Sequence, residues 1–348
     1  MNPLQGNARL GLAVKVLGQP GLKSNDSRRW QQGPHLRVSL GYVREIFAYL
    51  KTHAITMYRL SSDLAPYLTH PDMPQFRDQV TECADELREL GGIARAQGLR
   101  LSFHPSQYII LNSTDPKLTA QSIHDLESQA EMLDRMEQGP EAVVVVHVGG
   151  VYGERVAARE RWARTYEKLP ERARRRLVLE NDDTSFSAAD VLEIHRQTGV
   201  PLVFDHQHFW CLNPERLELR AAVKAFLRSW PEGVRPKLHF SSPRTEMREL
   251  KRKNRTTKKN ETVLMPPLLT GHADYNNPFE FATLMRQLGG LEFDVMLEAK
   301  AKDLALLRLR RDLLRCAPDV AARFAGSGNE APMLEEAITH ADLSSEPT

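Results

Sequence analysis

The sequence predicts a single α/β domain of the (β/α)8 class, the TIM-barrel architecture. Strand-like and helix-like segments alternate eight times over most of the 348 residues, as such a barrel requires. The run Val200–Phe204 is apolar without a break, which indicates a strand buried on both faces of a parallel sheet. The first strand is followed by no G-x-G-x-x-G turn, so Gly11-Leu12-Ala13-Val14 disfavours the main alternative, an open doubly wound sheet.

The predicted strands are short apolar segments bounded by polar residues, glycine or proline. The fourth, Ala142–His147, is the most strongly β-branched of them. In chain order, the strands are expected at 9–16, 55–60, 99–103, 142–147, 176–182, 200–205, 236–240 and 292–298.

The predicted helices lie between these strands, and several have clear end signals. Ser39 and Ser187 are expected to cap the first and fifth helices, Gly199 to end the fifth, and Asn213-Pro214 to open the sixth. In chain order, the helices are expected at 39–53, 76–97, 116–137, an arginine-rich segment after Gly150, 187–198, 214–229, 277–287 and 302–315.

Composition indicates a globular protein, with 41% hydrophobic and 26% charged residues. We expect one barrel domain over residues 1–320, with a basic insertion at 243–262, and a polar, flexible tail at 321–348. The three cysteines are far apart and form no C-x-x-C pair, which excludes a zinc ribbon and a disulfide framework. Neither a secretory signal nor a membrane-spanning run is present, so we expect a cytoplasmic protein, nucleoid-associated in a prokaryote.

The formal net charge of +2 conceals two strongly basic stretches. Residues 155–176 contain nine Lys or Arg against three Glu, and residues 244–259 contain eight against two. Two interpretations stay open at this point. Each stretch is either ordinary solvated surface or a surface that meets a polyanion such as a nucleic acid.

Metal-ligand residue types end six successive predicted strands. In a barrel these residues all project at the carboxyl end of the strands, where catalytic residues collect. Two loop histidines join them, which makes six of the twelve histidines and three carboxylates at one mouth. The expected metal ligands are His70, His104, His147, Glu180, Asp205, His208, His239, His272 and Glu298.

Nine candidate ligands exceed what one ion can use, so we expect two or three divalent ions, with Glu180 bridging them. Mixed imidazole and carboxylate ligands without thiolate fit Mn²⁺ or Zn²⁺ better than Mg²⁺. Such a cluster is suited to activating water and to stabilising the attacking and leaving oxygens of a phosphoryl displacement.

A Gln107-Tyr108 pair follows the third strand. It is either ordinary loop packing or, if the substrate is duplex DNA, an amide and an aromatic ring suited to entering a base stack. In the second case the ring replaces lost stacking and the amide fills a vacated pairing position.

Taken together and in order, these motifs resemble the UV damage endonuclease family, a relative of the endonuclease IV barrels, over roughly residues 9–302. The motifs that carry the resemblance are Arg59, Thr69-His70-Pro71, Ser102-Phe-His104-Pro-Ser-Gln107-Tyr108, Val146-His147-Val-Gly149-Gly150-Val-Tyr152-Gly153, Leu179-Glu180-Asn181-Asp182, Asp205-His206-Gln-His208, Pro236-Lys237-Leu-His239 and Glu298-Ala299-Lys300.

The resemblance implies a Mn²⁺-favouring, multi-metal phosphodiesterase that nicks damaged double-stranded DNA. The cut would fall immediately 5′ to a cyclobutane dimer, a 6-4 photoproduct or an abasic site, and would leave a 3′-hydroxyl and a 5′-phosphate. It implies a catalytic centre of Glu180, Lys237 and His239, with Lys237 a candidate for carboxylation. Gln107 and Tyr108 would probe the lesion and Lys300 would contact a phosphate.

Two departures from the family pattern concern lesion preference. Leu12 stands where the family often has an aromatic residue beside the lesion, and the insertion 243–262 is long and basic. We expect a monomer without an obligate protein partner. The alternatives are a metal-dependent sugar isomerase on the same barrel, which has no use for the basic stretches, and a non-catalytic lesion-binding protein.

Overall fold

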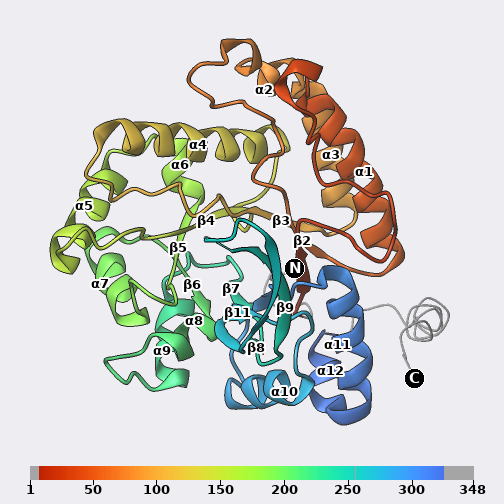
Figure 1. The fold of residues 1–348 in the computed structure, drawn as a ribbon, viewed down its shortest axis with the longest axis vertical. Helices are drawn as coiled ribbons and strands as arrows, with labels where there is room; N and C mark the ends of the chain where they lie inside the picture. Colours follow the sequence, from red (N-terminus) through yellow and green to blue (C-terminus); the bar gives the residue numbers. More distant parts are fainter. Residues whose placement is uncertain (1–7, 255, 325–348) are drawn as a thin grey trace.

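The computed structural model describes residues 8–254 and 256–324, and its centre is a closed barrel of eight parallel strands (Figure 1). The order around the barrel is β1-β12-β7-β6-β5-β4-β3-β2. The predicted barrel class is therefore confirmed. The barrel strands are β1 (Leu10–Ala13), β2 (Met57–Arg59), β3 (Arg100–Phe103), β4 (Val143–His147), β5 (Leu177–Glu180), β6 (Leu202–Asp205), β7 (Lys237–Phe240) and β12 (Asp294–Leu297).

Side chains alternate between the two faces of each strand, and this separates two kinds of interior. Outward-facing residues such as Leu12 and Leu238 belong to the large apolar core under the helices. Inward-facing valines of β4, β5 and β6 pack with Trp230 in a second, smaller cluster. The remaining inward positions include charged groups, because Lys237 and Asp294 are fully buried on β7 and β12.

Helices surround the strands on the outside of the barrel (Figure 1). The major helices are α1 (Leu36–Thr52), α3 (Ala84–Ala96), α4 (Pro116–Arg135), α5 (Arg155–Glu167), α7 (Ala188–Thr198), α9 (Leu219–Arg228), α10 (Pro278–Gln287) and α11 (Lys302–Cys316). Shorter helical segments are η1 (Trp30–Gln32), η2 (Pro74–Phe76), α2 (Gln79–Glu82), α6 (Glu171–Arg176), α8 (His206–Cys211) and α12 (Pro318–Phe324).

Some predicted helix ends are confirmed and others are wrong. Ser187 forms a reciprocal capping box with Asp190, and Gly199 ends α7 with a φ of 74°. By contrast, α1 is capped by His35, while Ser39 is buried inside the helix and accepts from the Asp26 amide.

The predicted helices at 76–97 and 214–229 also differ from the structure. The first is divided at Cys83, which ends α2 and precedes α3. The second begins later, because Asn213 closes a local turn with both backbone groups of Leu217 and leaves Glu218 to cap α9. Local side chain to backbone bonds of Asn compete with helix initiation in this way.

Much of the predicted basic loop 243–262 forms β structure among its described residues. Strand β8 (Pro243–Arg244) pairs antiparallel with β11 (Leu268–His272), and β9 (Arg248–Lys253) pairs antiparallel with β10 (Asn260–Met265). At the other end of the chain, the expected domain boundary at 320/321 falls inside α12, whose Phe324 ring packs on Phe281. The rest of the expected tail, residues 325–348, lies outside the described residues.

Candidate metal centre

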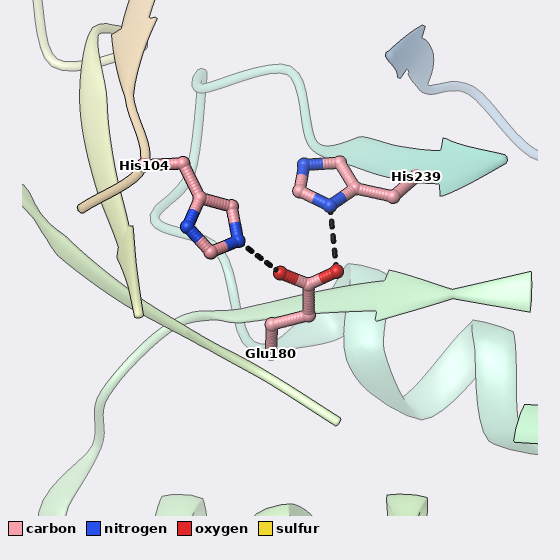
Figure 2. A group of neighbouring side chains, drawn as sticks. All are labelled: His104, Glu180 and His239. Carbon is pink, nitrogen blue, oxygen red and sulfur yellow. Dashed lines mark hydrogen bonds and ion pairs between the residues drawn. The ribbon is translucent and has the colours of Figure 1, made fainter. Parts of the chain in front are cut away.

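The site is built around Glu180, the last residue of β5 and a fully buried carboxylate. Its Oε2 lies 2.9 Å from Nε2 of His104, and its Oε1 lies 2.6 Å from Nδ1 of His239 (Figure 2). The strand register explains part of this grouping, because His147 pairs with Glu180 and Asp205 pairs with His239 on neighbouring parallel strands. Six strands therefore deliver their terminal polar side chains to one level of the barrel.

Carboxylates from three strands approach one another at this level. One ligand atom each from Glu180, Asp205, His239 and Glu298 lies within 4.8 Å of all the others. A second such group consists of His104, Glu180 and His239. Glu180 and His239 belong to both groups, so the structure provides adjoining candidate positions for more than one cation.

Three further histidines surround these two groups. Nε2 of His147 lies 3.6 Å from Glu180, and Nε2 of His272 lies 3.7 Å from Glu298. Nδ1 of His208 is 3.8 Å from Asp205 and 3.9 Å from Glu180. The rings follow one another around the mouth, with centroid separations of 5.1 to 6.1 Å along the series His239, His104, His147, His208 and His272.

The site is buried at its base and open at its rim. Glu180, Asp205 and His239 have no exposed surface. The side chains of His147 and His272 are 24% and 20% exposed. The mouth is therefore accessible to a substrate that approaches from the carboxyl end of the strands.

Electrostatics differ sharply among these groups. Burial would raise the pKa of Glu180, but His239 and His147 outweigh it and hold that pKa well below its ordinary value. Burial raises the pKa of Asp205 to about 7, and Glu180 and Glu298 act in the same direction. Burial would lower the pKa of His208, but Asp205, Glu180 and Glu298 raise it to about 10. Without a bound cation, the cluster compensates its negative charge by holding protons.

Arg59, the last residue of β2, compensates another part of that charge. Its Nη1 lies 2.6 Å from Oε1 of Glu298, and its Nη2 lies 3.0 Å from Nε2 of His239. Burial would raise the pKa of Glu298, but Arg59 and His239 hold it well below its ordinary value. Burial itself lowers the pKa of His239 to about 4, so its ring is neutral at pH 7. A neutral imidazole and an ionised carboxylate are the forms that bind metals.

Two buried ligand atoms have no hydrogen-bond partner among the described residues, Oδ2 of Asp205 and Nδ1 of His147. A buried polar atom without a partner is costly, so such atoms indicate a missing ligand. The donor set of imidazoles and carboxylates without thiolate matches the preference of Mn²⁺ or Zn²⁺. The residues present therefore fit a cluster of divalent cations.

Lys237 lies in the barrel interior beneath the cluster and is fully buried. Burial holds the pKa of Lys237 well below its ordinary value, and the charges of Arg59 and Arg100 lower it further. Its Nζ has no hydrogen-bond partner among the described residues. Burial therefore favours the uncharged form of this amine.

Other residues position the ligands, and the sequence analysis assigned them no role. The side-chain amide of Asn181 bonds both backbone groups of Asp205, and its backbone carbonyl lies 3.0 Å from Nδ1 of His208. Gln207 and Ser241 both hydrogen-bond to His272. The position of Arg59 could be predicted from the sequence. It is a charged residue at the end of the second strand, the position at which later strands carry candidate ligands.

The lesion-probe candidates lie at the tip of a turn. The Ile109 amide donates to the Ser106 carbonyl at 3.0 Å, which leaves Gln107 and Tyr108 at the two central turn positions. Tyr108 is 77% exposed. Lys300 is exposed beside the mouth, and its charge contributes to lowering the pKa of His272, after burial.

Two predicted site residues lie away from the cluster. Leu12 is fully buried on the outer face of β1, so it has no surface with which to contact a base, and we leave it out of the lesion contacts. His70 accepts from the Asp72 amide and lines a separate cavity of about 520 Å³ together with Asp125. Among the described residues, no hydrogen bond or ion pair joins His70 to Glu180 or its neighbours, and its role as a ligand stays a prediction.

The family model of UV-endonuclease UvdE matches residues 37–322. The chain belongs to this family. A UV DNA damage endonuclease of Bacillus velezensis is 34% identical over 268 residues, which cover 76% of this chain and 77% of that protein. The corresponding protein of Bacillus pumilus is 32% identical over 265 residues, covering 75% and 76%.

Solved structures agree with this assignment. The crystal structure of SacUVDE superposes with a TM-score of 0.71 at 27% identity, covering 88% of this chain and 98% of that chain. A 3-keto-D-glucoside 4-epimerase of E. coli has a TM-score of 0.52 at 11% identity, covering 87% and 99%, and shows likeness of fold alone. Among the described residues of this UvdE-family chain, no helix has both the length and the apolar character to cross a membrane.

Proposed function

We propose that this protein is a metal-dependent endonuclease that cuts UV-damaged double-stranded DNA immediately 5′ to the lesion. The proposed lesions are cyclobutane pyrimidine dimers and 6-4 photoproducts, with abasic sites as a further class, and the products carry a 3′-hydroxyl and a 5′-phosphate. The observation that carries the proposal is the convergence of Glu180, Asp205, His239 and Glu298 within 4.8 Å in a member of the UvdE family.

Two or three divalent ions, with Mn²⁺ preferred and Zn²⁺ as the alternative, would be held by the imidazoles and carboxylates at the mouth. Such ions supply Lewis-acid activation of water and neutralise charge that develops on the phosphate. Glu180 is placed to contact both groups of ligand atoms, which suits a bridging carboxylate. The proposed ligands are His104, His147, Glu180, Asp205, His208, His239, His272 and Glu298, together with His70 from the loop after β2.

The protein's own residues contribute orientation and charge balance. Arg59 fixes Glu298 and His239 relative to each other through its two Nη groups. Asn181 fixes the backbone of Asp205, and the Asp205 carboxylate caps α8 through the His208 amide at 2.7 Å. Residues whose positions are fixed in this way hold a ligand set in place with little reorganisation.

Lys237 is proposed to carry a carboxyl group. An uncharged amine attacks carbon dioxide through its nitrogen lone pair, forms a C–N bond and releases one proton, which gives a carbamate. Burial lowers the pKa of Lys237 and so favours the uncharged form that this addition requires. The carbamate would replace an unpaired amine with a further anionic ligand beneath Glu180 and Glu298.

At the rim, Tyr108 and Gln107 are proposed to enter the base stack at the lesion. An exposed ring can replace the stacking that a displaced base loses. Lys300 is proposed to contact a phosphate near the mouth. We propose that the protein acts as a monomer without an obligate protein partner.

The test is incision of a 5′-labelled duplex that contains a single cyclobutane dimer, with Mn²⁺ and with EDTA as the control. We expect one Mn²⁺-dependent cut adjacent to the 5′ side of the dimer and a 3′ end that a polymerase can extend. Tight binding without a cut would instead indicate a lesion-binding protein. If the protein neither cuts nor binds the duplex, with Mn²⁺ or with Zn²⁺, the proposal is overturned. Sugar isomerisation is then the next activity to assay.

A further inference from the structure

The basic insertion forms a separate two-stranded ribbon, which we define as the described residues 248–254 and 256–265. Strands β9 and β10 pair in continuous register from Arg248 with Met265 to Lys253 with Asn260. The ribbon follows the carboxyl end of β7 and leads into β11, which ends at His272, and Figure 1 draws β9 over the centre of the barrel. The barrel therefore carries an antiparallel ribbon, and both ends of this ribbon connect to segments at the rim of the metal centre.

Most cations of the ribbon have no ion-pair partner among the described residues, and the exception lies at its base. Arg248, at its base, pairs with Glu246 and Asp274. Glu261, which lies near the tip of the ribbon, accepts hydrogen bonds from the side-chain amide of Asn254 and forms no ion pair among the described residues. The exposed cations without a described ion pair are Lys251, Arg252, Lys253, Lys258 and Lys259.

The other basic stretch, 155–176, behaves differently. Asp190 on α7 pairs with Arg155 and Arg159, each at 2.7 Å. Asp134 on α4 pairs with Arg172, Arg175 and Arg176 at 3.3, 2.8 and 2.7 Å. The fold thus neutralises much of one basic stretch with carboxylates distant in sequence and leaves the charge of the ribbon available to a partner.

Strand register gives the ribbon two distinct faces. One face, here called the inner face, carries Arg248 opposite Met265, Leu250 opposite Val263 and Arg252 opposite Glu261. Arg248 and Met265 are partly buried and Leu250 and Val263 are each 38% exposed, so this face is the more covered one near the base of the ribbon.

The opposite face, here called the outer face, carries Glu249 opposite Leu264, Lys251 opposite Thr262 and Lys253 opposite Asn260. All six residues are exposed. Two positions along a strand span about 7 Å, so the two lysines can contact separate phosphates, which occur every ~3.4 Å along each strand of B-DNA. Thr and Asn side chains beside them are common hydrogen-bond donors to phosphate oxygens.

We propose that the outer face of the ribbon binds the sugar-phosphate backbone of intact duplex DNA that flanks the incision site. This inference rests on the proposed function and assigns its DNA-binding surface. Cations at fixed spacing on exposed backbone give binding that is independent of sequence and steeply dependent on salt. The ion pair between Arg248 and Asp274 ties the base of the ribbon to the segment that follows β11.

The attachment of the ribbon links this surface to the metal centre. Gln207, which follows β6, donates from Nε2 to the carbonyls of Leu269 and Gly271 at 2.8 and 3.0 Å. His272 follows directly, with Nε2 at 3.7 Å from Glu298. The ribbon therefore continues into β11, the strand that places the candidate ligand His272 at the mouth.

The experiment compares duplex binding by the unaltered protein and by Lys251→Gln/Lys253→Gln, using an undamaged 30-base-pair duplex over a series of salt concentrations. We expect the slope of log affinity against log salt to become shallower by about 2, since each lost phosphate contact removes about 0.9. Affinity at physiological salt should fall by about 10- to 50-fold, the corresponding loss for two contacts.

The matched control is Lys117→Gln/Lys224→Gln, which removes the same charge from exposed positions on α4 and α9 that have no ion pair in the described residues. Its salt slope should match that of the unaltered protein. A second variant replaces residues 251–262 with Asn-Gly, a two-residue turn suited to joining the paired residues Leu250 and Val263. It should bind duplex no better than the double-lysine variant.

Equal losses in the ribbon variant and the control would overturn the proposal, because the effect would then be one of total charge. An unchanged slope in the ribbon variants would overturn it as well. Loss of binding to a single-stranded oligonucleotide alone would overturn the assignment to duplex DNA. None of these measurements requires incision, so a protein that binds duplex through the ribbon but cuts no lesion would contradict only the proposed function.

Discussion

The two ends of the barrel interior both contain buried charge, but they are organised in opposite ways. At the amino end of the strands, both oxygens of Asp294 are engaged. Oδ2 lies 2.9 Å from Arg100 and 3.2 Å from Arg9, and Oδ1 accepts from the Arg9 amide and lies 3.5 Å from Arg235. At the carboxyl end, Oδ2 of Asp205 has no hydrogen-bond partner among the described residues.

The difference teaches how to distinguish structural charge from a binding site. One carboxylate surrounded by guanidinium groups is compensated within the protein and leaves little to offer a ligand. Three carboxylates and five imidazoles in contact, with one arginine among them, leave acceptor atoms in excess. Such an excess is what a cation can satisfy, so function is expected at the carboxyl end and stability at the amino end.

The largest expected effect is on catalysis at the carboxyl end. Glu180→Gln keeps the shape of the side chain but removes a charge common to both ligand groups. We expect the single-turnover incision rate to fall by about 10⁴-fold, equivalent to about 5.5 kcal/mol, with DNA affinity nearly unchanged. Glu45→Gln, an exposed change on α1, is the control. Unaltered rates at saturating Mn²⁺ would remove Glu180 from the centre.

At the amino end, Asp294→Ala should act on stability. It leaves Arg100 buried without its anionic partner, and removal of one member of a buried pair costs about 3–5 kcal/mol. Urea unfolding should show this loss, while metal stoichiometry at low urea stays the same as in the unaltered protein. Loss of bound metal in folded Asp294→Ala protein would show that the two ends are not independent.

A smaller effect is expected at the rim of the carboxyl end. Tyr108→Ala removes an exposed ring, and base–aromatic stacking contributes about 1–3 kcal/mol. We expect the preference for dimer-containing over undamaged duplex, measured by competition binding, to fall by about 5- to 150-fold. Phe279→Ala, which removes another exposed ring on α10, should keep the preference. Equal losses in the two variants would indicate general surface effects.

The smallest effect concerns protons released on metal binding. In the metal-free protein the pKa of His208 is raised to about 10 and that of Asp205 to about 7, so at pH 7 the first holds a proton and the second is about half protonated. Metal binding requires the deprotonated forms of these side chains. The free energy of metal binding should therefore become more favourable by about 1.4 kcal/mol per pH unit for each proton released.

Calorimetry of Mn²⁺ binding in two buffers with different ionisation enthalpies measures this release directly. We expect between one and two protons per protein at pH 7. Proton uptake, or an affinity independent of pH between 6 and 8, would contradict the charge compensation assigned to the carboxyl end.

Much of the candidate site could be predicted from the sequence, because strand-terminal position is a local property. Each strand is a short apolar run, and the residue that follows it must lie at the carboxyl end of a parallel barrel. His104, Glu180, Asp205 and His239 are identified in this way, and the structure brings their side chains together. Helix ends are harder to predict. His35 caps α1 and Glu218 caps α9, where the sequence pattern predicted Ser39 and Asn213, because several nearby polar residues can make the capping hydrogen bond.

Other properties depended on the direction of a side chain. Leu12 lies in a strand whose residues are apolar on both faces, so the sequence could not say which face points into the barrel. His70 lies in a long loop without a periodic pattern to place it, and the structure puts it beside Asp125 in another cavity. Gln207 and Ser241 became relevant only because β11 returns to the mouth next to α8.

The sequence by itself determined the barrel, the strand ends and the ligand types, because these follow from composition and periodicity over a few residues. Only the tertiary structure decided which charges are compensated. The stretches 155–176 and 244–259 have the same net charge of +6 in the sequence. Folding brings Asp134 and Asp190 to the first and leaves the outer half of the second exposed, because the partner of a charge is set by proximity in space and not along the chain.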